Sequence, residues 1–312
     1  MRMSDNTATL RIVPFDPAHL PALRDLVNAH LTLLVPGWAL TEDILAAHLQ
    51  RNPGQAITDL LVSERLTLCA LDGDRLVAAA HLLCYGASAG VGSALAGTAE
   101  IAWFLAWADA QEAAASLLAA SRAQMQAWRA RRMGAWDTGL PMGPFVGVPD
   151  VWPHLAEALR SAGFRPSERE EEVVLGGDLD AVAVPGDPPV PELTIERRLV
   201  TGLWAAHELR FSARLDGQEL GRCEIALDLS EGGALPALQP WAQLTELQVN
   251  ETWRNRGIGA SLVRHAVAWA RLGGRSRLLV AALAENAGAI RFYRRFGWDV
   301  LIQEQTGWEL AV

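Results

Sequence analysis

The chain has 312 residues, a formal net charge of −9 at pH 7 and 50% hydrophobic residues. This length suffices for about two domains, and the hydrophobic fraction suffices for a sizeable core. The acidic balance argues against nucleic acid as a partner, and no apolar stretch is long enough to span a membrane.

Further features of the composition indicate the cellular setting. The first residues mix polar and apolar types, so no signal peptide is predicted. The cysteines Cys69, Cys84 and Cys223 are odd in number and widely spaced. They predict reduced thiols in a cytoplasmic protein, without a disulfide framework, and neither they nor the histidines have the spacing of a metal site. The chain contains no lysine, which together with abundant alanine and glycine suggests a GC-rich bacterial genome.

The first half of the chain predicts a mixed order of strands and helices. Residues 9–16 alternate like a strand, and helical patterns follow over 17–34 and 41–50, the second with Thr41 as a candidate N-cap. Residues 66–86 predict a hairpin that turns near Gly73. Residues 99–134 then predict a strand followed by a long helix.

A proline-rich stretch divides the chain. Residues 177–191 contain Pro185, Pro188, Pro189 and Pro191, a composition typical of a semi-stiff extended linker. The sequence therefore predicts one domain over residues 1–176 and a second over 192–312. The second begins with a strand over 193–200 and a hairpin that turns near Gly217, with no long pair of amphipathic helices between them.

A strand, a glycine-containing turn and a helix follow one another in the second domain. Residues 244–249 alternate like a strand, residues 254–260 read RNRGIGA, and residues 261–274 carry apolar side chains at helical spacing up to Gly273-Gly274. The first turn of a helix has N–H groups without intrahelical partners, and the helix dipole adds positive potential. Gly257 and Gly259 allow close approach to the backbone, so the turn predicts a phosphate site.

This stretch resembles the GNAT superfamily of acyl-CoA N-acyltransferases. The resemblance rests on R-x-x-G-x-G, formed by Arg254, Gly257 and Gly259, and on the N-x-x-A-x-x-F-Y-x-x-x-G-W ending over residues 286–298. A dinucleotide fingerprint fits less well, because its third glycine falls on Leu262. The resemblance implies an α/β (α+β) protein with two GNAT-like domains in tandem, each with a mixed, mostly antiparallel central sheet flanked by helices.

The two halves of the chain align at an offset of 146 positions. This offset places Glu100 on Glu246 and Trp107 on Trp253, and it places Arg254, Gly257 and Gly259 on Ala108, Gln111 and Ala113. A later segment places Leu159 where Tyr293 stands. We therefore interpret the first half as a degenerate GNAT-like domain that has lost the arginine, both glycines and the tyrosine.

The resemblance implies that acetyl-CoA is the acyl donor and that an amine attacks it directly. Arg254, Arg256 and the backbone N–H groups of Gly257, Ile258, Gly259 and Ala260 would hold the pyrophosphate. Leu247 and Val249 would bind the pantetheine arm through their backbone, and Asn286 would contact the cofactor arm.

Two further residues have implied chemical roles. Glu246 is the candidate general base, although it could instead be a structural carboxylate, as the matching position of Glu100 suggests. Strand alternation predicts Thr245, Leu247 and Val249 on one face and Glu246 on the other. Tyr293 is the candidate general acid, because its neutral hydroxyl can donate to the departing sulfur.

The acceptor is not determined by the sequence. In GNAT domains a helical region forms one wall of the acceptor site. Here that wall is missing or reduced to residues 201–206, so that the N-terminal domain or a partner chain would supply it. A small-molecule amine is the first acceptor class and a protein N-terminus or side chain is the second. A CoA-binding sensor or scaffold without turnover is the non-enzymatic alternative, and a homodimer is left open.

Overall fold

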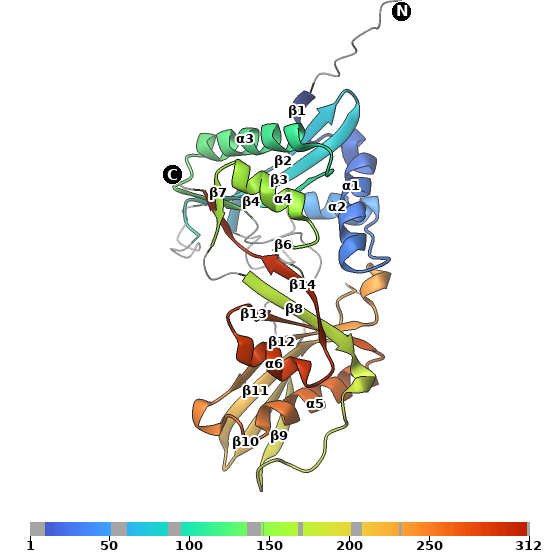
Figure 1. The fold of residues 1–312 in the computed structure, drawn as a ribbon, viewed down its shortest axis with the longest axis vertical. Coiled ribbons are helices and arrows are strands. Elements are labelled where there is room, and N and C mark those ends of the chain that lie inside the picture. Colours follow the sequence, from blue (N-terminus) through green and yellow to red (C-terminus); the bar gives the residue numbers. More distant parts are fainter. Residues whose placement is uncertain are drawn as a thin grey trace, which may run out of the picture. The chain divides into compact units, whose positions relative to one another are not determined.

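The computed structural model describes residues 10–50, 61–86, 95–135, 145, 147–167, 171–200, 208–230 and 233–310. The chain folds into two compact units. The N-terminal unit consists of Met1–Glu171 and Glu304–Val312, and the C-terminal unit consists of Glu172–Gln303 (Figure 1).

The N-terminal unit is built on a seven-stranded sheet in the order β1-β2-β3-β4-β5-β15-β7. All neighbours in this sheet are antiparallel except β4 and β5. Helices α1 and α3 both pack on β3, and β4 is buried along its whole length, so both faces of the sheet are covered. The strands are β1 (Leu10–Pro14), β2 (Val62–Asp72), β3 (Arg75–Tyr85), β4 (Thr98–Ala106), β5 (Arg132–Ala135), β7 (Phe164–Pro166) and β15 (Trp308–Leu310). The helices are η1 (Pro17–His19), α1 (Leu20–Leu34), α2 (Glu42–Leu49), α3 (Gln111–Ala127) and α4 (Pro153–Ser161), and the short β6 (Val148–Pro149) pairs with Glu304 and Gln305.

The C-terminal unit has a second sheet in the order β14-β8-β13-β12-β11-β10-β9. Its strands are β8 (Glu171–Asp178), β9 (Thr194–Val200), β10 (Glu208–Leu215), β11 (Gln218–Ala226), β12 (Trp241–Val249), β13 (Arg277–Leu283) and β14 (Asp299–Gln305). Its helices are α5 (Ile258–Leu272) and α6 (Ala287–Arg294), with short 3-10 turns η3 (Leu179–Ala181), η4 (Pro236–Leu238) and η5 (Glu251–Trp253). The predicted fold class, two mixed and mostly antiparallel sheets flanked by helices, is confirmed.

Helix α5 forms where the sequence predicts it, for the predicted reason. The apolar side chains at helical spacing, Leu262, Val263, Ala266, Val267 and Ala270, are all fully buried in one cluster with strands β10 to β13. Burying one Leu or Val side chain contributes about 1.5–3 kcal/mol, so this face fixes the helix on the sheet. The helix ends at Gly273, and Gly274 follows with a positive φ of 77°.

The two sheets do not follow the predicted domains. Strand β15, from the C-terminal end of the chain, lies between β5 and β7 in the N-terminal sheet. Strand β8, most of which falls inside the predicted first domain, lies between β13 and β14 in the C-terminal sheet, where Figure 1 shows it in yellow-green beside the red β14. The chain therefore passes between the units near residues 171–172 and again near 303–304.

This strand exchange changes the interpretation of the proline-rich stretch. The predicted division at residues 176 and 192 does not follow the two units, because β8 pairs with β13 over residues 172–178. Residues 177–191, predicted to be a linker between domains, connect β8 to β9 within the C-terminal unit. They are anchored by Arg271 of α5, which donates to the Val182 carbonyl at 2.6 Å, and by the buried side chain of Leu193.

Of the helices that the structure describes, none combines the length and the apolar character needed to cross a bilayer. Cys69, Cys84 and Cys223 are buried and free of disulfides.

Candidate functional site

Strands β12 and β13 pair only over their first four residues. Trp241 to Leu244 pair in parallel with Arg277 to Val280, and the pairing then stops although β12 continues to Val249. The other edge of β12 stays paired with β11 as far as Val249. The backbone of residues 245–249 therefore has one free edge, on the side where β13 diverges. This opening provides N–H and C=O groups for an extended amide chain.

A β-bulge begins at the same point. Leu244 pairs with Ile225 and Glu246 pairs with Glu224, so Thr245 is an extra residue on β12. Its hydroxyl donates to Glu208 Oε2 at 2.6 Å, on the same face of the sheet as Glu246. The prediction that Thr245 shares a face with Leu247 and Val249 is therefore wrong, because a bulge interrupts strand alternation. Leu247 and Val249 do share a face and pack against the core.

The turn before α5 presents unpaired N–H groups. Gly257 is the N-cap of α5 with a φ of 83°, and Asn255 also has a positive φ of 61°. Within the described residues, the N–H groups of residues 255–260 have no hydrogen-bond acceptor. Unpaired donors at a helix N-terminus, where the helix dipole is positive, form a site for an anion. The geometry of Gly257, Ile258, Gly259 and Ala260 thus matches a phosphate site.

The side chains of Arg254 and Arg256 contact the residues around the turn and remain exposed to solvent. Arg254 donates through Nε to the Val249 carbonyl at 3.1 Å and through Nη1 to Glu251 at 3.4 Å, while its side chain stays 58% exposed. The Arg256 guanidinium lies over the Trp253 ring, 4.6 Å from its centre. Neither cation is buried, so each adds positive potential at the turn and stays accessible to a ligand.

The two glycines of the turn are glycines for different reasons. A Cβ on Gly257 would need a positive φ and would lie 2.9 Å from Cβ of Pro189, in the proline-rich stretch. A Cβ on Gly259 would meet only Phe292 and Val249, at 3.6 Å, which is ordinary van der Waals contact. The protein itself therefore requires a glycine at position 257, whereas position 259 would accept a Cβ without a clash. Sequence reasoning missed the contact of Pro189 with the turn, and no local pattern signals it.

Helix α6 contributes Asn286 and Tyr293. Asn286 is the N-cap, and its Oδ1 accepts from Ala289 N at 3.0 Å, so part of its role is structural. Tyr293 is only 6% exposed, and its ring stacks on Trp298 with centroids 5.9 Å apart. Burial, and secondly the neighbouring Cys223, raise the pKa of the Tyr293 hydroxyl well above its ordinary value. Because Cys223 pairs with Leu247, α6 brings a protonated phenol to the open part of β12.

Glu246 has a partner that the sequence did not reveal. Arg222 on β11 donates to both of its carboxylate oxygens, at 3.0 and 2.7 Å. The hydrogen bonds from Arg222 are the largest of the causes that lower the Glu246 pKa. The side chain is 35% exposed and ionised at neutral pH, which leaves it able to accept a proton but makes it a weaker base.

The N-terminal unit contains the same architecture without this turn. Strand β4 pairs with β5 from Thr98 to Ile101, as β12 pairs with β13 from Trp241 to Leu244, which aligns the strands at an offset of 143. The helices begin at residues 111 and 258, an offset of 147. The predicted single offset of 146 is therefore wrong, and Glu100 corresponds to Gln243 rather than to Glu246.

The difference between the two offsets lies in the turn itself. Residues 250–257 separate β12 from α5, whereas only residues 107–110 separate β4 from α3. The N-terminal unit thus lacks four residues of the turn, and Ala110 takes the place of the N-cap glycine. At the end of β4, the Ala106 carbonyl is 3.0 Å from His154 Nε2 of α4. The described residues of the N-terminal unit include no counterpart of the arginines and glycines of the turn.

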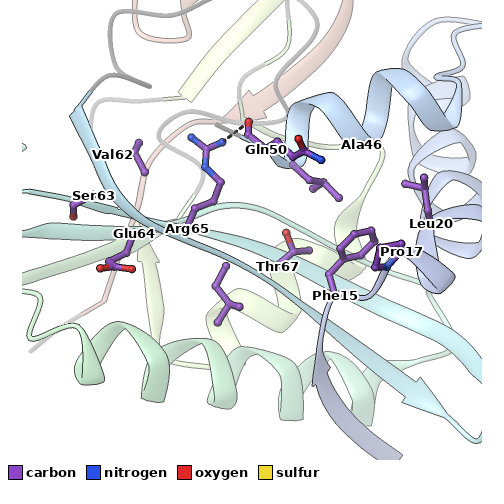
Figure 2. Close-up of a pocket in the computed structure, with 12 residues that line it drawn as sticks. Phe15, Pro17, Leu20, Ala46, Gln50, Val62, Ser63, Glu64, Arg65 and Thr67 are labelled. Carbon is purple, nitrogen blue, oxygen red and sulfur yellow. Dashed lines mark hydrogen bonds between the residues drawn. The ribbon is translucent and has the colours of Figure 1, made fainter. Parts of the chain in front are cut away.

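A cavity of about 640 Å³ lies elsewhere, in the N-terminal unit (Figure 2). Six consecutive residues of β2, from Val62 to Thr67, line it together with residues of α2 and the start of α1. Consecutive strand residues point to opposite faces, so the cavity runs along the edge of β2, where pairing with β1 has ended at Leu68. The predicted site residues lie in the other unit, and none of them lines it.

Comparisons with known proteins agree with this geometry. Residues 185–298 match the acetyltransferase (GNAT) family. This segment is a GNAT acetyltransferase domain. An uncharacterized N-acetyltransferase of Methanocaldococcus jannaschii is 38% identical over 58 residues, which are 19% of this chain and only 26% of that protein.

Two solved structures have the fold of the whole chain. A tandem GNAT protein from the clavulanic acid biosynthesis pathway has a TM-score of 0.62 and 14% identity, covering 97% of this chain and 99% of that one. A GCN5-related N-acetyltransferase from Sphaerobacter thermophilus has a TM-score of 0.63 and 15% identity, covering 96% of this chain and 95% of that one. At this identity they show the fold alone, which is the tandem GNAT fold predicted from the sequence.

Proposed function

We propose that the C-terminal unit binds acetyl-CoA and transfers its acetyl group to a primary amine. The observation that carries this proposal is the separation of β12 from β13 beside a turn whose N–H groups have no acceptors among the described residues. The free edge of residues 245–249 suits the amides of pantetheine, and the turn at residues 255–260 suits the pyrophosphate. The glycine at position 259 supports the fit, because a Cβ there would clash with no part of the protein itself.

Several residues would share the binding of the donor. Arg254 and Arg256 would add charge-assisted hydrogen bonds to the pyrophosphate, each contributing about 1.5–3 kcal/mol. Leu247 and Val249 would bind through their backbone groups. The amide nitrogen of Asn286 makes no hydrogen bond within the described residues and could contact the cofactor arm while Oδ1 caps α6. When bound, acetyl-CoA supplies an activated acetyl group whose C–S bond breaks as the amine nitrogen forms the new C–N bond.

Tyr293 is proposed as the general acid for the departing thiolate. Its hydroxyl makes no hydrogen bond to any described residue, so it is available as a donor. The raised pKa of this buried phenol keeps it protonated throughout the neutral range. Its place beside Cys223, opposite Leu247 of β12, supports access to the sulfur of a bound thioester.

Glu246 is proposed as the base that accepts the proton of the amine. It lies next to the bulge residue Thr245, on the face of the sheet opposite Leu247. Its lowered pKa makes it a weak base, so it would act best through a water molecule, or on an amine whose proton becomes acidic as the nitrogen attacks. The alternative role, holding Arg222 in the sheet, is supported by the same ion pair.

A small-molecule amine is the proposed acceptor class. In the N-terminal unit, α1 and α2 separate the first two strands of the sheet, whereas only residues 201–207 separate β9 from β10. These seven residues lie outside the described part of the chain. Among the described residues no helix pair stands at this place in the C-terminal unit, so the wall of the proposed acceptor site would come from the N-terminal domain or a partner chain.

A screen of primary amines tests the proposed function. The purified chain is mixed with acetyl-CoA and single amines, free CoA is detected by its thiol, and the acetylated product is identified by mass spectrometry. Peptides with free N-termini form a second arm, which tests the protein-acceptor alternative. Binding of acetyl-CoA without acetylation in either arm would contradict an enzymatic function and support the sensor alternative.

A further inference from the structure

Glu208 is a buried carboxylate with one oxygen left without a partner. It opens β10 and is only 2% exposed. Its Oε2 accepts from the Thr245 hydroxyl at 2.6 Å, whereas Oε1 has no hydrogen-bond partner among the described residues. Buried polar atoms in native proteins almost always have a partner, and a buried charge without one is costly. Such an atom therefore calls for an explanation.

None of the arginines on the neighbouring strands bonds to Glu208 Oε1 in the described part of the chain. Glu208, Arg210, Arg222, Glu224 and Glu246 point to one face of strands β10 to β12, which we call the polar face. Arg210 is bound to Glu224, and Arg222 is bound to Glu246. Arg198 of β9 lies opposite Arg210 on this face, but it is exposed and makes no hydrogen bond or ion pair to Glu208. Among the described residues Glu208 Oε1 therefore has no cationic partner, and a cationic ligand would supply one.

Glu208, with its unpartnered oxygen among the described residues, lies close to the proposed reaction site. Its partner Thr245 is the bulge residue, the first residue of β12 after the pairing with β13 ends. The small Ala226 of β11 lies opposite Glu208, between it and β12, so the carboxylate reaches across β11 to the bulge. An acceptor on the polar face would approach the separated strands from the side opposite Tyr293.

We propose that Glu208 Oε1 binds the ammonium group of the acceptor, which is therefore an aliphatic amine that is cationic at neutral pH. This inference rests on the proposed function and deepens it by naming the charge of the acceptor and the residue that binds the charged group. An ammonium brings both a charge and N–H donors, whereas an alcohol brings one donor and no charge. Binding makes and breaks no covalent bond, and the proton that the nitrogen must lose before attack passes to the proposed base Glu246.

The test measures binding before it measures turnover. The wild-type chain, saturated with CoA, is heated with a panel of primary alkylamines and polyamines and with alcohols of the same carbon skeletons. We expect an amine to raise the melting temperature while its matched alcohol does not. In Glu208→Gln the affinity for that amine should fall about 10- to 100-fold, the range for losing a hydrogen bond to a charged group.

A control variant separates this site from general charge. Glu196→Gln removes an exposed carboxylate from the same face, where Glu196 lies 3.6 Å from Arg214, and it should leave amine binding unchanged. The conservative variant Glu208→Asp keeps the carboxylate but shortens the side chain by one carbon, so it should bind the amine with intermediate affinity. The melting shift caused by CoA alone shows that each variant is folded.

The outcomes distinguish the two proposals. Absence of a CoA shift in the wild type would contradict the proposed function. A CoA shift with no amine shift in the wild type, or an amine shift of equal size in Glu208→Gln, would overturn the assignment of Glu208. For any amine that is also acetylated, Glu208→Gln should raise its KM more than it lowers kcat, because the lost contact exists before the reaction begins.

Discussion

Replacing Gly259 with alanine should stabilise the free protein and weaken its binding of acetyl-CoA. Gly259 is the second residue of α5, and an added Cβ would meet only Phe292 and Val249 at 3.6 Å. Alanine is a better helix former than glycine, so the free energy of unfolding of the free protein should rise by about 0.5–1 kcal/mol. The same methyl group would be added beside the N–H group of residue 259, which has no acceptor among the described residues and which the proposed phosphate must approach.

The loss of affinity follows from the hydrogen bonds at stake. Displacing the phosphate from one N–H donor removes a charge-assisted bond, which contributes about 1.5–3 kcal/mol. The dissociation constant of acetyl-CoA should therefore rise about 10- to 100-fold. Calorimetric titration gives the affinity, and urea unfolding of the same variant gives the stability.

A matched variant isolates the effect on the helix. Gly288 is the second residue of α6, and a Cβ there would meet only Asn286 Oδ1, at 3.5 Å. Gly288→Ala should raise stability by a similar amount, which checks the helix-propensity part of the reasoning. If Gly259→Ala is more stable and still binds acetyl-CoA within about threefold of the wild type, the turn does not hold the phosphate.

Four further predictions follow from the same geometry. Tyr293→Phe keeps the stack on Trp298 and should lower kcat about 10²- to 10⁴-fold with little change in acetyl-CoA affinity; a wild-type rate in steady-state kinetics would exclude the acid role. Arg222 lowers the pKa of Glu246, so their ion pair should stabilise the fold fully above about pH 4.3, the ordinary value for glutamate, and less as the pH falls through the lowered pKa. Urea unfolding between pH 2 and 6 should therefore show a smaller acid loss of stability in Arg222→Ala. Calorimetry should give one acetyl-CoA per chain, because the N-terminal turn is four residues shorter, and a stoichiometry of two would refute this. Trp308→Ala should lower the free energy of unfolding by about 3–5 kcal/mol, because this side chain of β15 is 1% exposed. The lost stability should appear as faster hydrogen exchange in β5 and β7, which pair with β15, rather than in β12.

Local patterns in the sequence predicted local structure well. The apolar periodicity of α5, the N-cap Thr41 of α2 and the glycine turn at Gly257 all depend on residues within a few positions of one another. The Thr41 hydroxyl accepts from Ile44 N at 3.3 Å, as its capping role requires. The fold class was implied by the resemblance to the GNAT superfamily, and the order of these elements agrees with it.

Features that depend on distant residues were not predictable in the same way. The apolar run Val173 to Leu175 is typical of a strand but does not indicate its partner, and β8 pairs with β13, about one hundred residues later. The exchange of β8 and β15 therefore shifts both unit boundaries away from the proline-rich stretch. The partner of Glu246, Arg222, lies on the neighbouring strand and has no motif of its own.

Insertions of one to four residues account for the errors at the candidate site. The bulge at Thr245 moves this residue to the polar face and brings it to Glu208, which sequence reasoning did not single out. The four extra residues before α5 break the constant offset between the halves, so that Glu100 was matched to the wrong position. A buried carboxylate with a single donor can be recognised only from coordinates.

Hydrogen exchange at single-residue resolution, with and without acetyl-CoA, tests most directly where the donor binds. The N–H groups of residues 255–260 have no acceptor in the part of the chain that the structure describes, so they should exchange quickly in the free protein and become protected on binding. Residues 245–249 should be protected as well, while residues 107–112 of the N-terminal unit should not change. Protection at residues 107–112, or binding without protection of residues 255–260, would contradict the assignment of the acetyl-CoA site to the C-terminal unit.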